Sequence, residues 1–259
     1  MIRYTFIILI FLSFKIYAQK NEFNELISLF ATPKKEIPLI LAKTYFDFQP
    51  TERANKLLTG QIIVQTDTYL IVSTHLECNA KRNCVQSSIT SFSNTGERIG
   101  TIAFERTITD CSFDDSRKSV YVSKELLVFK EVREKLDCQG DGSQIGVKMW
   151  LEFQPIREEG TFAKPYTDRK SLERENYIFS HRVFTEEELK EKTEEELAII
   201  KNEIFAAHGY MFKKEMWQDY FESKSWYTPS DQDATEKLTP IEKKNIELIV
   251  SLKKHEDNN

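Results

Sequence analysis

The chain has 259 residues, of which 40% are hydrophobic and 12% aromatic, so it can build the core of one large or two modest domains. This composition excludes a chain that is disordered throughout. Acidic residues outnumber basic ones by 41 to 36, a net charge of −5, which argues against nucleic acid and other polyanions as partners.

The first residues have the pattern of a secretory signal peptide over 1–18. Arg3 supplies the positive start, Ile7 to Phe14 form the apolar stretch, and Ala18 is a small residue ahead of a cut. An uncleaved membrane anchor is the alternative, but the apolar run stops at Lys15 and is short for a span. We expect an exported protein, periplasmic or secreted, with no membrane contact beyond the signal peptide and, after the cut, 34 basic against 41 acidic residues.

Residues 61–156 carry alternating runs of β-branched and aromatic side chains, which is typical of strands, and a short helix over 24–30 precedes them. The expected strands are Gln61–Gln65, Tyr69–Thr74, Gln86–Phe92, Arg98–Arg106, Ser119–Ser123, Leu126–Val132 and Val147–Gln154. Ser93-Asn94-Thr95-Gly96 has the composition of a hairpin turn. Because no helical pattern separates these runs, we predict an antiparallel β domain over 19–156, a sandwich or partial barrel, within an α+β protein.

The four cysteines lie in the first half of the chain, at Cys78, Cys84, Cys111 and Cys138. An even number in an exported chain favours two disulfides, for which three pairings are possible. We favour Cys78 with Cys84 as a short clasp and Cys111 with Cys138 across two strands. A zinc site is the alternative, but the spacings lack the close cysteine pairs that such sites use.

Residues 157–176 are charged and poor in aliphatic side chains, and we interpret them as a linker to a helical domain over 177–255. Three Thr-x-x-Glu patterns in that domain fit the capping box, in which the threonine hydroxyl accepts the third helical amide and the glutamate reaches back to the threonine at the cap. They are Thr185 with Glu188, Thr193 with Glu196, and Thr239 with Glu242. The acidic run from Glu186 to Glu196 therefore has a structural reason and does not indicate a cation site.

The segment after Leu197 predicts an amphipathic helix. Ile200, Ile204 and Ala207 recur at spacings of three and four, and Gly209 can end the helix in a left-handed cap.

Two polar residues of this helix, Glu203 and His208, lie about 140° apart around its axis, so they do not share one small site unaided. His208 in the last turn can bond free carbonyls of the helix, which explains its position without a function. Asn202 can likewise tie the helix to a neighbouring loop.

An aromatic cluster follows this helix, and core packing is its default interpretation. Its members are Phe212, Trp217, Tyr220, Phe221, Trp226 and Tyr227. We expect Trp226 and Tyr227, just before Pro229, to be the more exposed pair, with rings that could stack on sugars.

The run from Lys201 to Tyr210, Lys-Asn-Glu-Ile-Phe-Ala-Ala-His-Gly-Tyr, resembles the signature of the YARHG domain. The resemblance covers Tyr177 to His255. The two Thr-Glu-Glu-Glu-Leu runs match the family's entry, Phe221 to Tyr227 its middle, and Leu238 to Ile249 its closing helix.

Two positions depart from the family's motif. Phe205 stands where the family has Tyr and Ala207 where it has Arg, so any role of that hydroxyl or guanidinium is absent here. The resemblance implies a small extracellular bacterial module without an established activity. The family's association with peptidases and kinases is compatible with an accessory role.

The leading hypothesis is a non-catalytic binding protein of the bacterial envelope rather than an enzyme. It would recognise cell-wall glycan or an envelope protein through a groove between the motif helix and the Trp226-Tyr227 turn. The candidate ligand-binding residues are Asn202, Glu203, His208, Tyr210, Trp226 and Tyr227. No metal, cofactor or nucleic acid is expected.

Two other functions compete with this hypothesis. A cell-wall hydrolase would use Glu203 or His208 as general acid or base. It would need a second group from the β half, and Glu77, Asp110 and Asp137 near the cysteine loops are the candidates. An inhibitor or immunity-like protein would instead make its contact through an exposed strand edge.

Overall fold

The computed structural model describes residues 20–52, 54–78, 84–168, 170–230 and 233–256. The chain divides into two units, residues 1–167 and 168–259. The expected signal peptide, residues 1–18, lies outside the described residues. Among the helices that are described, none is both long and apolar enough to cross a membrane.

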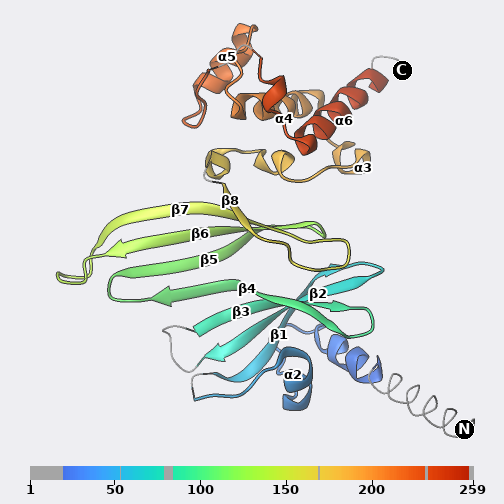
Figure 1. Cartoon of the computed structure of the whole chain (residues 1–259), viewed down its shortest axis with the longest axis vertical. Helices are drawn as coiled ribbons and strands as arrows, with labels where there is room; N and C mark the ends of the chain where they lie inside the picture. The colour runs from blue at the N-terminus through green and yellow to red at the C-terminus, as the bar shows by residue number, and fades with distance from the viewer. Residues whose placement is uncertain (1–19, 53, 79–83, 169, 231–232, 257–259) are drawn as a thin grey trace, which may run out of the picture. The chain divides into compact units, whose positions relative to one another are not determined.

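Within the described residues, the first unit contains one antiparallel sheet whose eight strands follow one another in chain order, as Figure 1 shows. The strands are β1 (Ala54–Gln65), β2 (Tyr69–Cys78), β3 (Cys84–Ser93), β4 (Arg98–Thr109), β5 (Phe113–Val122), β6 (Leu126–Leu136), β7 (Gln144–Pro155) and β8 (Tyr166–Asp168). The predicted turn after β3 is confirmed, with Gly96 at φ +88° and the Ser93 N–H donating to the Glu97 carbonyl at 2.8 Å. The predicted antiparallel β domain is confirmed.

Both faces of β2 are buried, which explains its uninterrupted apolar run. Leu70 and Val72 point to one face, against the helical residues 20–29 and α2 (Leu39–Phe46). Tyr69 and Ile71 point to the other face, because side chains alternate along a strand. There they pack in one core with Leu127 and Phe129 of β6. The sheet is therefore curved, so that strands far apart in its order share a core.

The outer edge of β1 is partly covered. The Ile37 N–H donates to the Leu57 carbonyl at 2.9 Å and the Lys34 N–H to the Thr59 carbonyl at 2.7 Å. This short pairing interrupts the edge that a partner strand would need for an inhibitor-like contact.

A buried ion cluster lies on β5, β6 and β7, whose ends reach beyond the predicted apolar runs. Arg117 is 7% exposed, and its Nη1 lies 2.6 Å from Glu131 Oε1 and 2.8 Å from Glu152 Oε1. Its guanidinium also stacks 3.7 Å from the centre of the Phe129 ring. Arg117 lies outside the predicted strands but belongs to β5, because carboxylates on the neighbouring strands neutralise its charge.

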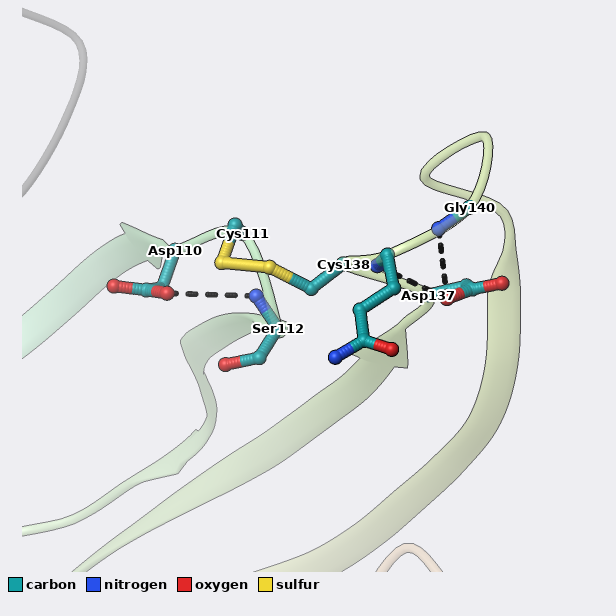
Figure 2. Close-up of a disulfide and its surroundings, with 7 residues drawn as sticks. Asp110, Cys111, Ser112, Asp137, Cys138 and Gly140 are labelled. Atoms are coloured by element: carbon teal, nitrogen blue, oxygen red, sulfur yellow. Dashed lines mark hydrogen bonds between the residues drawn. A yellow bond between two sulfur atoms is a disulfide. The ribbon is translucent and has the colours of Figure 1, made fainter.

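Cys111 and Cys138 form the predicted disulfide, with Cα atoms 5.0 Å apart. The bond joins the turn before β5 to the turn after β6, and Figure 2 shows the neighbouring turns held by their own carboxylates. The predicted clasp between Cys78 and Cys84 lies outside the described side chains.

The second unit is helical. Its elements are η1 (Lys170–Glu173), η2 (Tyr177–Ser180), α3 (Glu186–Leu189), α4 (Glu194–Ala207), α5 (Glu215–Glu222), η3 (Thr235–Lys237) and α6 (Pro240–Glu256). At all three predicted capping boxes the glutamate accepts the backbone N–H of its threonine, at 2.8 to 2.9 Å.

The segment 157–176 differs from the linker that its composition suggests. Its first part belongs to the β unit, where Ile156 bridges to Phe162. Its last part belongs to the helical unit, where Ser171 and Arg174 are buried. Its charges are not all solvated, because some have partners inside the fold.

We expect replacement of both Cys111 and Cys138 by serine to destabilise the β unit by about 3–4 kcal/mol. Their bond closes a loop with a sequence separation of 27, and such a loop restricts the unfolded chain by roughly that free energy. Urea unfolding of residues 19–259, followed by circular dichroism, measures the loss. An unchanged unfolding midpoint would show that the strand pairing alone determines stability.

Candidate functional site

The end of α4 is a Schellman motif, in which two backbone amides turn back onto carbonyls of the last helical turn. The Gly209 N–H donates to the Ala206 carbonyl at 2.9 Å, and the Tyr210 N–H to the Phe205 carbonyl at 3.2 Å. The rings of Phe205 and Tyr210 lie 5.7 Å apart and supply the apolar contact that accompanies this motif. The predicted left-handed cap is confirmed.

Gly209 is required for two separate reasons. Its φ of +78° is a left-handed conformation that other residues rarely adopt. A Cβ at this position would also lie 2.3 Å from Ser230 Oγ. The Ser230 N–H donates to the Gly209 carbonyl at 2.9 Å, so the chain after Trp226 is held against the end of α4.

His208 precedes this glycine and contacts a buried carboxylate. Its Nε2 lies 2.9 Å from Glu242 Oε2, and the Glu242 side chain is only 3% exposed. The same Oε2 accepts the Thr239 N–H at the start of α6. Burial favours a raised pKa for Glu242, but hydrogen bonds from His208, the Thr239 amide and Ser180 lower the pKa overall.

Glu203 forms a second buried pair, with Arg174. Both side chains are 4% exposed, and Arg174 Nε lies 3.3 Å from Glu203 Oε1. Asn176 donates to both oxygens of this carboxylate, from its backbone N–H and its side-chain amide, each at 2.9 Å. Burial lowers the pKa of Arg174, while Glu203 and Glu242 act in the opposite direction.

Ser180 connects the two pairs. Its hydroxyl accepts from Arg174 Nη2 at 3.0 Å and contacts Glu242. Glu203 and His208, predicted to lie apart around the helix, do not share one open site. They are linked by a chain of polar contacts through Arg174, Ser180 and Glu242.

Asp168, Ser171 and His181 have the residue types of a hydrolase triad but a different arrangement. Ser171 Oγ lies 2.7 Å from Asp168 Oδ2 and 3.0 Å from His181 Nε2, so the serine is between the other two. In a triad the histidine takes that central place. Ser171 is also fully buried, which keeps a substrate carbonyl away from its hydroxyl in this conformation.

The aromatic cluster is largely a core. Phe221 is 1% exposed and Tyr227 7%, so the expectation that Tyr227 is exposed is wrong. The Tyr227 hydroxyl donates to the Tyr210 carbonyl at 2.7 Å, which places the ring inward. Trp226 remains partly exposed, in a turn that Ser225 anchors by donating to Glu173 at 2.6 Å.

Two hollows flank α4. The first, called here the cap pocket, has a volume of about 480 Å³ and is lined by Lys170, Ala206, Ala207, His208, Gly209, Trp226, Thr228, Ser230 and Lys237. The second, called here the α4–α5 groove, has a volume of about 890 Å³, and Asn202, Phe205, Tyr210, Lys213, Lys214 and Trp217 are among its lining residues. The predicted site residues are therefore divided: His208 and Trp226 line the pocket, Asn202 and Tyr210 line the groove, and Glu203 and Tyr227 are buried.

The three carboxylates considered as partners from the β half have structural contacts. Glu77 Oε2 lies 3.5 Å from Lys56 Nζ. Asp110 accepts the Ser112 N–H at 3.4 Å and Asp137 the Gly140 N–H at 3.0 Å, each within its own turn. Across the residues that the structure describes, no group of three or more His, Cys, Asp or Glu could hold a metal ion.

Sequence reasoning missed the partners of the motif residues. Arg174 was assigned to the linker, and Glu242 was recognised only as part of a capping box. Asn245 was not singled out, although its buried amide donates to the Phe179 and Arg182 carbonyls at 2.7 and 2.8 Å. Only the Thr239-x-x-Glu242 pattern gave a signal in the sequence.

Residues 175–254 match the family model of the YARHG domain, so the helical unit carries this domain and the predicted resemblance is confirmed. Neither a curated protein nor a solved structure matches the chain.

We expect Glu203→Gln to lower the free energy of unfolding by roughly 3 kcal/mol, because Arg174 would stay buried without an opposite charge. Urea unfolding with tryptophan fluorescence measures this. Glu247→Gln, at an exposed position of α6, is the control and should change little. Full stability in Glu203→Gln would contradict a structural role for the pair.

The stability of the helical unit should fall on mild acidification because of His181. Burial lowers the pKa of His181 from 6.5 to about 4, although Asp168 acts to raise it. The unfolded chain therefore binds a proton at this histidine at higher pH than the folded protein does. The stability that neutral His181 contributes is complete above pH 6.5 and is lost as the pH falls toward about 4.

The expected loss from this residue is about 2 kcal/mol between pH 7 and pH 5. Urea midpoints at the two pH values measure it, and His181→Gln should flatten the difference. An equally steep dependence in the variant would assign the effect to other groups.

Proposed function

We propose that this YARHG-containing chain is an exported, non-catalytic binding protein of the bacterial envelope, and that its cap pocket recognises cell-wall glycan. The observation that carries the proposal is the pocket itself, where the family's His-Gly motif opens onto the partly exposed Trp226.

The lining of the pocket fits a sugar. Trp226 offers an aromatic surface, while Lys170, Thr228 and Ser230 provide groups that can bond to hydroxyls and carboxylates. Ligand sites commonly combine an apolar wall with a few placed polar groups. Glu242 fixes the ring of His208 at the pocket's edge, so this wall is already organised before binding.

The contacts of the acidic residues favour binding over catalysis. Glycoside hydrolysis typically uses a pair of carboxylates, and no aspartate or glutamate is among the described residues that line the pocket. Glu203 is buried and already accepts from Asn176 on both oxygens. The Nε2 of His208 is likewise taken up by Glu242.

Export has two supports. Residues 1–18 have the charge and apolar pattern of a signal peptide. The Cys111–Cys138 bond is of a kind that persists in oxidising compartments. The YARHG domain is itself an extracellular type of module, and the periplasm and the exterior fit equally.

We expect the purified chain, residues 19–259, to be retained by purified cell wall, and Lys170→Ala to weaken retention about tenfold, the effect of one lost charged contact. Lys170 is suited to the test because its side chain is exposed and removing it should leave the melting temperature unchanged. Lys243→Ala, at an exposed site on α6, controls for the change in net charge.

His208→Ala is the second variant, and its melting temperature is measured beside its binding because the change also leaves Glu242 without a partner. Retention lost in both variants supports the pocket. Unretained wild type, or equal retention of wild type and Lys170→Ala, contradicts the proposal. Capture of a protein from envelope extract without retention on cell wall would replace the glycan with a protein partner.

A further inference from the structure

The α4–α5 groove is separate from the cap pocket, since the two have no described lining residue in common. Asn202 and Phe205 reach it from α4, Tyr210 from the chain after the helix, and Trp217 from α5. With a volume of about 890 Å³, it is the larger of the two hollows.

Asn202 is the unusual residue of this groove. It is 9% exposed, yet within the described part of the chain its side-chain amide has no hydrogen-bond partner. Buried amides are normally bonded, because an unpaired one loses its contacts with water without replacement. The polar atoms of Asn202 are also not sealed from solvent, so they open into the groove that the residue lines.

Asn245 shows what a structural asparagine looks like in the same unit. It is fully buried, its amide donates to two carbonyls, and its Oδ1 accepts the Phe184 N–H at 2.9 Å. The fold therefore satisfies one buried asparagine completely and leaves the other with its bonding capacity free for a ligand.

The wall beside Asn202 is aromatic and firmly held. The Tyr210 ring packs 5.0 Å from that of Phe212. Two hydrogen bonds hold the backbone of this wall. The Tyr227 hydroxyl donates to the Tyr210 carbonyl at 2.7 Å, and the Phe212 N–H donates to Gln218 Oε1 at 2.7 Å. A rigid aromatic wall with a bonding amide beside it suits the alternating apolar and hydroxylated faces of a sugar ring.

The rim of the groove carries positive charge on an acidic protein. The charged lining residues are Lys201, Lys213, Lys214 and one carboxylate, Asp233. Lys213 and Lys214 are exposed, and neither has a carboxylate partner among the described residues. Since the chain as a whole has a net charge of −5, two adjacent free lysines provide a local attraction for an anion that the remaining surface would repel.

We infer that the α4–α5 groove is a second binding site, which takes a saccharide carrying an anionic group. Asn202 bonds to the sugar's polar substituents, the aromatic wall contacts its ring, and Lys213 and Lys214 attract the anionic group. This site shares no described lining residue with the cap pocket, so it can be tested independently of the proposed function.

Isothermal titration of residues 19–259 with hyaluronan hexasaccharide, and with hexa-N-acetylchitohexaose as the uncharged probe of equal length, tests the inference. We expect the anionic probe to bind about tenfold more tightly, a difference that disappears at high salt. Failure to bind either probe, or equal affinity for both, would overturn the assignment.

Asn202→Leu separates a ligand role from a structural one. It should reduce affinity for the hexasaccharide about tenfold while the melting temperature stays the same or rises, since no protein hydrogen bond is lost. Asn245→Leu is the contrasting variant and should melt at a clearly lower temperature. Retained affinity in Asn202→Leu, or a loss of melting temperature like that of Asn245→Leu, would overturn the role of Asn202.

The double variant Lys213→Gln/Lys214→Gln should lose the preference for the anionic probe. Lys243→Gln/Lys244→Gln removes the same charge from two adjacent exposed positions on α6 and should keep it. If the two double variants lower the affinity for the anionic probe equally, the net charge of the whole surface attracts it, which would overturn the role of the groove lysines. The titrations are repeated in Lys170→Ala, which weakens the cap pocket, and the preference for the anionic probe should persist in that variant. Loss of the preference there would assign it to the cap pocket and overturn the inference.

Discussion

The buried carboxylate of Glu242 determines how the helical unit is assembled. Its Oε2 accepts the N–H of Thr239, the residue before α6, and also contacts His208 at the end of α4, so one side chain holds two helix ends together. Through Ser180 it reaches Arg174, whose charge is balanced by Glu203. A buried charge of this kind is tolerated only when every partner is in place, so the network fixes the orientation of α4 and the surfaces on either side of it.

Local patterns were predictable and long-range partners were not. The capping boxes and the Gly209 cap follow from residues three or four positions apart, which chain geometry brings together in any helix. The antiparallel β domain followed from alternation. However, β5 begins earlier and β6 ends later than predicted, and there Asp115 and Arg133 pair across the two strands. The Glu203 and Glu242 networks depend on Arg174 and Ser180, which sequence spacing does not place near them.

The two buried asparagines illustrate the same limit for the candidate site. The sequence favours Asn202 as a tie to a neighbouring loop and gives no signal for Asn245. The structure reverses this, since Asn245 is fully bonded and Asn202 lines the α4–α5 groove without a protein partner. Residue type and helical position are alike in both cases. Only the surrounding carbonyls and amides decide which of them serves the fold and which is left for a ligand.

The central claim is that the surfaces flanking α4 bind ligand while the buried polar network beneath them is structural. Nuclear magnetic resonance of the ¹⁵N-labelled chain, titrated with soluble cell-wall fragments, tests it directly. The account predicts shifts in the side-chain amide signals of Asn202 and in the indole signal of Trp226, with the Asn245 amide unchanged. Shifts confined to the β unit, or equal shifts of Asn245 and Asn202, would contradict it.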